Sequence, residues 1–265
     1  MIGLSFNFFG ITIYTFWLFV DLGVLLSILY LVVYLKRFKI RRYVIHSVAL
    51  SVVAFIFGFL GARILSVLEV GAPLRATYDF TIHAGFTFYG GLILVVPVLF
   101  MYLVLFKLPM APTITILGIS LALCYAIGRL GCFFSGDGCY GIITALPWGM
   151  SFPNGIIPTV HKVHPTPLYE ALSSFIIFFS FHKAITKKTR ESVQKIYNMH
   201  FFYLIILSFA ISRFLVEFLR TNRIIYFFSL SQWVSLILIL LCYCFFFVIN
   251  KKKTDQQSLL TERRA

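Results

Sequence analysis

The chain alternates between long apolar stretches and short polar or basic connections. Apolar runs of about 20 residues, the length a helix needs to cross the hydrocarbon core of a bilayer, recur along the sequence. Seven such runs can be drawn, over residues 11–35, 44–68, 86–106, 114–131, 168–184, 199–219 and 230–249, followed by a basic tail over residues 250–265. This pattern predicts an all-α polytopic membrane protein in which residues 1–265 form a single integral-membrane domain.

Composition and charge narrow the class further. The 265 residues are 60% hydrophobic and 12% charged, whereas soluble domains carry about 25% charged residues. The formal net charge of +14 would suit a nucleic-acid partner in a soluble chain. In a chain this apolar, the positive charge is better explained as the signal that orients the protein in the membrane. We therefore expect membrane lipid as a partner and no nucleic acid.

Lysine and arginine are distributed unevenly over the polar connections. Sixteen of the 23 follow the first, third and fifth apolar runs or lie in the tail, with clusters over residues 36–42, 183–195 and 251–264. Because basic loops stay in the cytoplasm, this asymmetry predicts a cytoplasmic C-terminus and, with seven spans, an N-terminus outside. The connections over residues 131–167 and 220–228 then face the exterior.

A glycine-rich stretch over residues 128–141 carries a dense set of reactive side chains. Its five glycines in fourteen residues favour a tight, backbone-exposing turn over a continuous helix. Arg129 beside such a turn suits an anion, and phosphate fits a bidentate guanidinium and free N–H groups best. Cys132 and Cys139 also lie here. A disulfide between them is possible, but we expect two free thiols, and their spacing predicts no metal site.

Charged residues inside the apolar runs indicate either helix locking or ligand binding. An ion at the centre of a bilayer costs about 2.5–3.5 kcal/mol, so Arg63, Arg129 and Arg213 need partners. Glu217 follows Arg213 by four residues and shares its helix face, while Asp21 lies in the first run. These charges could simply satisfy one another and hold helices together. Three cations against two carboxylates nevertheless leave one positive charge in excess, which favours an anionic ligand.

Two further polar segments lie near the ends of predicted spans. Tyr89, Gly90 and Gly91 open the third run, where paired glycines permit close backbone approach. His164 begins a His-Pro-Thr-Pro segment that leads into the fifth run, and prolines suit the first turn of a helix. A histidine near a membrane surface is more often a structural hydrogen-bonding group than a catalyst, and no full set of zinc ligands lies near this one.

Taken in order, these residues resemble the prolipoprotein diacylglyceryl transferase family. The similarity extends from Tyr14 to about Leu240 and rests on eight segments that follow one another along the chain. They are Tyr14, Gly61-Ala62-Arg63, Tyr89-Gly90-Gly91-Leu92, Gly128-Arg129-Leu130-Gly131 with Gly136-Asp137 and Tyr140-Gly141, Leu146-Pro147-Trp148-Gly149-Met150, His164-Pro165-Thr166-Pro167-Leu168-Tyr169-Glu170, Arg213-Phe214 with Glu217-Phe218 and Arg220, and Ser231-Gln232-Trp233.

The resemblance implies a multi-pass enzyme of the bacterial cytoplasmic (inner) membrane, with its active site toward the outer leaflet. Such an enzyme transfers the diacylglyceryl group of phosphatidylglycerol to the lipobox cysteine thiol of a prolipoprotein. The products are a thioether and glycerol phosphate. The implied partners are therefore phosphatidylglycerol and prolipoprotein lipobox peptides. No cofactor or metal is implied, because the donor is already activated as a phosphodiester.

The resemblance also assigns roles to single residues. Arg129 and Arg213 would hold the phosphate and neutralise charge as the C–O bond breaks, with Glu217 orienting Arg213. The implied catalytic residues are Tyr89, Arg129, Arg213 and Asp137. The implied substrate-binding residues are Tyr14, Arg63, Gly90, Gly91, Cys132, His164, Tyr169, Glu170 and Glu217.

Four positions depart from the family pattern. Tyr89 stands in place of a histidine that is a favoured base candidate, Cys132 in place of an asparagine, Asp137 in place of a glutamate, and Phe209 in place of a tyrosine. A phenol is a poor base at neutral pH, because its ordinary pKa is about 10. These changes leave two alternatives open, a divergent paralogue that acts on another acceptor and a non-catalytic lipid-binding membrane protein. A small-anion transporter ranks third, because no internal repeat is found.

Overall fold

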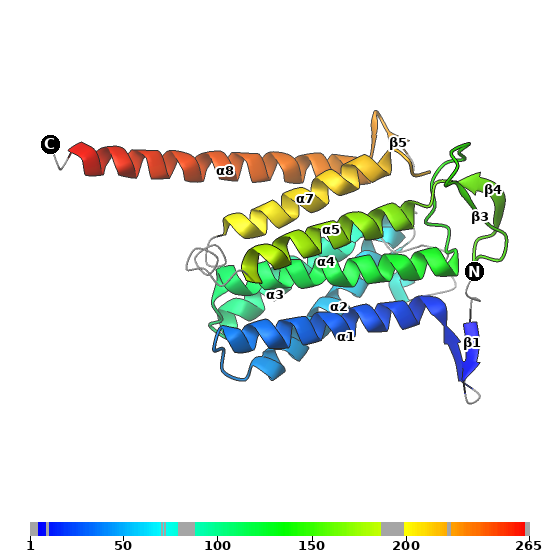
Figure 1. Ribbon diagram of the computed structural model, residues 1–265, viewed down its shortest axis with the longest axis horizontal. Helices are drawn as coiled ribbons and strands as arrows, with labels where there is room; N and C mark the ends of the chain where they lie inside the picture. The colour runs from blue at the N-terminus through cyan, green and yellow to red at the C-terminus, as the bar shows by residue number, and fades with distance from the viewer. Residues whose placement is uncertain are drawn as a thin grey trace.

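The computed structural model describes residues 5–8, 11–69, 71, 73–78, 88–186, 199–221 and 224–262 of the chain. Seven α-helices form most of this part of the molecule (Figure 1). They are α1 (Thr15–Arg37), α2 (Tyr43–Glu69), α3 (Phe88–Leu105), α4 (Met110–Ser135), α5 (Thr166–Thr186), α7 (His200–Glu217) and α8 (Leu230–Glu262), with a short 3-10 helix η1 (Leu74–Tyr78) after α2.

Three small antiparallel hairpins gather at one end of the helices (Figure 1). They pair β1 (Ser5–Phe8) with β2 (Ile11–Tyr14), β3 (Met150–Phe152) with β4 (Thr159–Val163), and β5 (Ile224–Ile225) with β6 (Phe228–Ser229). The connection between α1 and α2 lies at the opposite end. The two ends of the bundle therefore differ in structure as well as in sequence.

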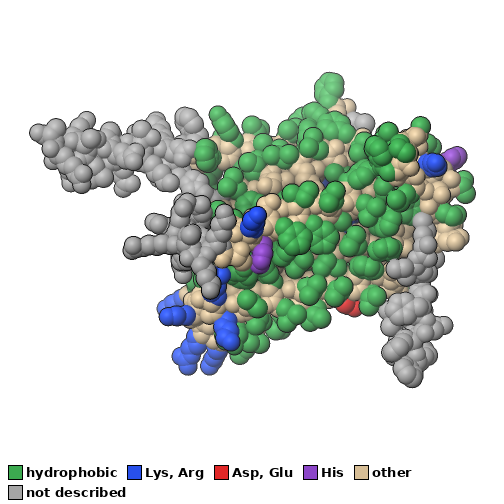
Figure 2. Space-filling view, viewed as in Figure 1, with side chains coloured by type: hydrophobic (Ala, Val, Ile, Leu, Met, Phe, Trp, Pro, Cys, Tyr) green, Lys and Arg blue, Asp and Glu red, His purple; other side chains and the backbone are tan. Residues whose placement is uncertain are grey.

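The outer surface of the bundle is apolar. By length and composition, α1, α2, α4 and α5 can cross a membrane, and Tyr89–Leu105 and Leu230–Phe246 are shorter apolar helices. Ile93, Leu172 and Leu240 point outward and are 67%, 62% and 61% exposed. Figure 2 shows apolar side chains over most of the visible face. Because each predicted run corresponds to one helix, the prediction of an all-α polytopic membrane protein is confirmed.

Some boundaries differ from those predicted. Residues 11–14 of the first predicted span form β2, because their β-branched and aromatic residues pair with β1, and α1 begins only at Thr15. At the other end α8 continues to Glu262, so most of the predicted tail is helical and projects beyond the bundle (Figure 1). Residues 86–87 of the third predicted span lie outside the described residues.

The predicted turn over residues 128–141 is half helix, which corrects the expectation that its glycines exclude one. Helix α4 runs through Gly128 and Gly131 and ends at Ser135. A Cβ at Gly131 would meet the Cβ of Phe19 at 2.9 Å, so this glycine lets α1 pack closely against α4. The packing of α1 on α4 offsets the low helix propensity of glycine. The turn itself begins at Gly136, whose φ of 58° ends the helix in the left-handed conformation.

Paired glycines also join α2 to α3. A Cβ at Gly61 would lie 2.4 Å from the carbonyl oxygen of Gly90, and a Cβ at Gly91 would lie 2.7 Å from that of Gly58. Such contacts between small residues are typical of helices that pack within membranes. Gly90 and Gly91 therefore serve the approach of α2, and the substrate-binding role that the resemblance implies for them stays a prediction.

The main hydrophobic core lies between α1, α4, α5 and α7. Buried residues from all four helices, including Leu31, Ile119, Ile177 and Ile205, form one cluster there. A second cluster joins α1, α2 and α3 through Leu35, Leu50 and Leu103. The first core positions α4, α5 and α7 rigidly with respect to one another, and these three helices carry most of the charged residues described next.

Candidate active site

A buried carboxylate, Glu170, is the centre of the charged network. Helix α5 begins with Thr166-Pro167, which suits a first helical turn, and Glu170 follows on the buried face with 2% of its surface exposed. Its Oε2 lies 2.5 Å from the Nε atom of Arg129. Its Oε1 forms ion pairs with the Nη1 atoms of Arg213 and Arg220, the latter at 3.1 Å. One carboxylate from α5 thus pairs with three arginines.

A second carboxylate, Glu217, holds two of these arginines, Arg213 and Arg220, from the end of α7. Its Oε2 lies 2.8 Å from Nη2 of Arg213, which confirms the pairing expected from their four-residue spacing, and 3.9 Å from Nε of Arg220. Its Oε1 accepts a hydrogen bond of 2.8 Å from the hydroxyl of Ser229. Among the described residues, three guanidinium groups therefore share two carboxylates, which leaves one positive charge in excess.

Tyr125 links Arg129 to Glu170. Its hydroxyl donates to Oε2 of Glu170 at 3.0 Å and accepts from Nη2 of Arg129 at 2.9 Å. The Arg129 guanidinium also lies over the Tyr125 ring, 4.9 Å from its centroid. Since Tyr125 and Arg129 are four residues apart on α4, one helix face presents both groups. Arg129 is thereby fixed in orientation.

Two N–H groups in this network donate no hydrogen bond within the described part of the chain. The Nε atoms of Arg213 and Arg220 are buried, and neither donates a hydrogen bond to a described residue. Each arginine side chain keeps 12% of its surface exposed. A buried N–H without an acceptor is costly, because it has lost its water. Both atoms are therefore suited to an acceptor that enters from outside the protein.

Tyr89 borders the network from α3. Its hydroxyl forms a hydrogen bond of 2.7 Å with the Ser235 hydroxyl and donates one of 3.1 Å to the carbonyl of Ser231, so it is tied to α8. The residue is 3% exposed. Nη2 of Arg213 lies 3.4 Å from the hydroxyl of Ser231, which connects Tyr89 to the arginines through one serine. Burial and these contacts favour a positioning role for Tyr89.

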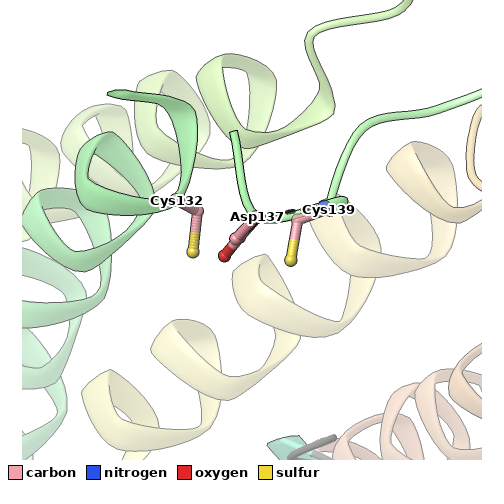
Figure 3. A group of neighbouring side chains, drawn as sticks. All are labelled: Cys132, Asp137 and Cys139. Carbon is pink, nitrogen blue, oxygen red and sulfur yellow. Dashed lines mark hydrogen bonds between the residues drawn. The ribbon is translucent and has the colours of Figure 1, made fainter. Parts of the chain in front are cut away.

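Cys132, Asp137 and Cys139 form a compact group beside Arg129. Cys132 lies in the last turn of α4, and the loop that follows brings Asp137 and Cys139 back toward it (Figure 3). Nη1 of Arg129 lies 3.8 Å from Sγ of Cys132. Hydrogen bonding with the Cys132 thiol, aided by the positive charge of Arg129, lowers the pKa of Cys139 to about 7. Both cysteines are free thiols, as expected.

The remaining residues expected at the site make other contacts. Nε of Arg63 donates to the carbonyl of Thr77 at 3.4 Å, so this arginine ties α2 to η1. His164 and Trp148 each bond the hydroxyl of Tyr169, at 3.2 Å and 2.9 Å, in a cluster at the start of α5. Tyr14 is 57% exposed where β2 meets α1.

Sequence reasoning missed two members of the network. Tyr125 lies in an apolar run, and only its spacing from Arg129 hinted at a contact. Arg220 was assigned to an exterior loop, although it follows Glu217 by three residues. Glu170 was expected to bind substrate, whereas its described contacts are to the arginines and Tyr125.

An apolar bundle that encloses a buried cluster of three arginines and two carboxylates defines a polytopic membrane protein with a candidate site for an anionic ligand. The family model described as prolipoprotein diacylglyceryl transferase matches residues 4–248. The chain belongs to this family, and the resemblance drawn from its motifs is confirmed.

Individual relatives carry a matching name. A protein of Clostridium tetani called phosphatidylglycerol–prolipoprotein diacylglyceryl transferase is 29% identical over 242 residues, which are 89% of this chain and 93% of that protein. A protein of the same name from Finegoldia magna is 31% identical over 89% of this chain and 91% of its own length. One from Leptospira interrogans is 37% identical over 145 residues, which are 54% of this chain and only 44% of that protein.

Proposed function

We propose that the protein transfers the diacylglyceryl group of phosphatidylglycerol to the lipobox cysteine thiol of prolipoproteins. A C–S bond forms at the terminal glyceryl carbon of the donor, the C–O bond to the phosphate breaks, and glycerol phosphate leaves. Family membership supports the reaction class, and the names of the relatives supply the donor and the acceptor. The chemistry of the arginine network supports the same donor independently.

The observation that carries the proposal is the unbalanced arginine network. One positive charge in excess and two buried N–H donors that bond to no described residue match a phosphodiester, which has one negative charge and several acceptor oxygens. The network lies within a bundle whose outer surface is apolar, and the donor resides in the membrane around that surface. As the C–O bond breaks, negative charge grows on the phosphate, and the fixed guanidinium groups stabilise that charge.

Each charged residue then has a separate task. Arg129 and Arg213 bind the phosphate, and Arg220 adds a third donor group. Glu170 and Glu217 hold these side chains in place, so the arginines need little reorganisation when the donor arrives. In this proposal, Asp137, half-buried beside Arg129, and the residues around Tyr169 contact the acceptor peptide.

The basic residues orient the protein in the bacterial cytoplasmic membrane. Lys and Arg gather at the end where α1 joins α2 (Figure 2), and five of them, Lys36, Arg37, Lys39, Arg41 and Arg42, are exposed there. That end faces the cytoplasm, and the hairpins with residues 136–141 face outward. Reporter fusions test this orientation, with a cytoplasmic signal expected after Lys188 and Lys253 and an external one after Gly155. A cytoplasmic signal at Gly155 would contradict it.

The direct test of function is transfer by the purified protein. Labelled phosphatidylglycerol and a synthetic lipobox peptide are incubated with it, and mass spectrometry follows the thioether adduct on the peptide cysteine. A peptide with serine in place of the cysteine is the matched control and should remain unmodified. If labelled phosphatidylglycerol binds but no adduct forms, the protein is a lipid-binding member of the family, which is the alternative that the buried Tyr89 hydroxyl favours.

A further inference from the structure

The group formed by Cys132, Asp137 and Cys139 has the composition of a metal site. One ligand atom from each residue, the two Sγ atoms and a carboxylate oxygen, lies within 4.8 Å of the other two. Figure 3 shows the three side chains projecting to the same side of the loop. A tetrahedral ion with metal–sulfur bonds of about 2.3 Å needs ligand atoms roughly 3.8 Å apart. Small side-chain rotations would close the remaining gap.

The backbone holds these side chains together before any ion arrives. Gly136 and Gly138 adopt φ angles of 58° and 88°, which turn the chain back over the end of α4. The backbone N–H of Cys139 donates to Oδ1 of Asp137 at 3.0 Å, and the carbonyl of Cys139 accepts a bond of 2.6 Å from the Thr166 hydroxyl. One oxygen of the Asp137 carboxylate is thereby oriented, and the other remains to bind an ion.

The local charge also suits a divalent cation. Two thiolates and one carboxylate carry three negative charges, and a divalent cation reduces this total to one. The remaining negative charge lies close to a guanidinium group, because Nη1 of Arg129 is 3.8 Å from Sγ of Cys132. An N–H group directed at a ligating sulfur is the kind of outer contact that orients metal ligands and tunes their basicity. The nearby arginine is therefore compatible with a bound cation.

We propose that Cys132, Asp137 and Cys139 bind a thiophilic divalent cation of the zinc class, with a fourth coordination position open. Cys132 is buried, whereas Asp137 and Cys139 are only half-buried, so the site is open on one side. Three protein ligands and an open position distinguish catalytic zinc sites from structural ones, which have four protein ligands. The two thiolates favour zinc over magnesium or calcium, which prefer oxygen ligands.

The open position has a use that rests on the proposed function. An acceptor cysteine that binds there loses its proton to solvent and becomes a metal-bound thiolate next to Arg129. Its sulfur then attacks the glyceryl carbon, the C–S bond forms, and the phosphate oxygen leaves with the electrons of the C–O bond. This arrangement supplies an activated thiol in a chain that has Tyr89 in place of the family histidine.

Metal binding is measured on the full-length protein in detergent under reducing conditions. Cobalt(II) replaces zinc as a spectroscopic probe, and thiolate ligands produce a near-ultraviolet charge-transfer band. We expect about one equivalent of cobalt with such a band, and its displacement by zinc but not by magnesium. Cys139→Ser should lose most of the band, and Asp137→Asn should weaken binding by at least about tenfold. Cys244→Ser changes an exposed thiol outside the group and serves as the matched control.

Three outcomes would overturn the proposal. The first is a reduced wild-type protein that binds cobalt without a thiolate band. The second is a band that persists unchanged in Cys139→Ser. A thiol count on the protein isolated without reductant addresses the alternative use of the group. If Cys132 and Cys139 form a disulfide and the reduced protein takes up no metal, the pair is a redox site and the metal site is refuted.

Transfer activity separates this inference from the proposed function. Chelator-treated protein should lose transfer, keep its affinity for phosphatidylglycerol, and recover when zinc is added. If metal binds as expected but transfer does not respond to chelation, the metal site stands and its role in thiol activation is wrong. If no preparation forms the thioether, the proposed function fails while the cobalt result still decides the metal site.

Discussion

Two groups of basic residues at opposite ends of the bundle differ in their partners. Arg129, Arg213 and Arg220 are largely buried, and each forms an ion pair with Glu170. Arg41 and Arg42, in the connection between α1 and α2, are exposed. No carboxylate among the described residues forms an ion pair with either of these two. The same side chain thus builds a buried ion-pair network at one end and an exposed basic surface at the other, and burial with a shared carboxylate makes the difference.

The largest effect is expected when the shared carboxylate is removed. Glu170→Gln keeps the shape of the side chain but leaves three guanidinium groups without their common partner. Breaking a buried ion pair on one side costs about 3–5 kcal/mol. We therefore expect a large loss of thermal stability in detergent, measured by differential scanning fluorimetry, together with loss of transfer. Asp21→Asn, which removes an exposed carboxylate on α1, is the control and should leave stability nearly unchanged. Equal melting temperatures for Glu170→Gln and wild type would contradict the central role of Glu170.

Replacing one arginine by lysine tests geometry separately from charge. Arg129→Lys keeps the positive charge but cannot reproduce the contacts that Nε and Nη2 make with Glu170 and Tyr125. We expect transfer to fall at least about tenfold in the lipobox peptide assay. The matched change at the other end, Arg41→Lys, should change the transfer rate by less than about twofold relative to wild type. An Arg129→Lys enzyme with near wild-type kcat/KM would show that Arg129 acts only as a point charge.

A smaller effect is expected from Tyr89→Phe, which removes only a hydroxyl group. Its two contacts with α8 would be lost, at a cost of about 1 kcal/mol each in unfolding free energy. If Tyr89 positions α8 near Arg213, the variant should keep substantial transfer at every pH. Complete loss of transfer with unchanged phosphatidylglycerol binding would instead identify Tyr89 as the base. In that case Tyr89→His should restore activity with a pH profile displaced to lower pH.

The smallest effect is expected at the exposed basic end. Changing Arg41 and Arg42 together to glutamine removes two charges that have no carboxylate partner among the described residues. Stability should change by less than about 0.5 kcal/mol, because surface substitutions away from special features are nearly neutral. Transfer by the correctly inserted protein should be unchanged. A loss of activity comparable to that of Arg129→Lys would remove the functional distinction between the two ends.

The apolar pattern was sufficient to predict the helices. Each predicted run corresponds to one helix, because crossing a bilayer requires about 20 apolar residues whatever the neighbours are. Arg129, Arg213 and Glu217 were found for a related reason, since a charge in an apolar run is conspicuous and costly. Local spacing also sufficed for the pair Arg213–Glu217, which one helical turn brings together. These features depend only on residues that are near one another in the sequence.

Tertiary packing decided which distant residues share the site. Glu170 lies 41 residues after Arg129 and 43 before Arg213, so the sequence could not indicate that one carboxylate pairs with both. Packing also determined the conformation of the glycines. Gly131 remains helical because α1 lies against α4, and Gly136 and Gly138 form the turn that brings Asp137 and Cys139 to Cys132. The sequence determined the membrane-spanning elements because each depends only on its own run of apolar residues, whereas the sharing of Glu170 by three arginines and the proximity of the two thiols arise only from tertiary contacts.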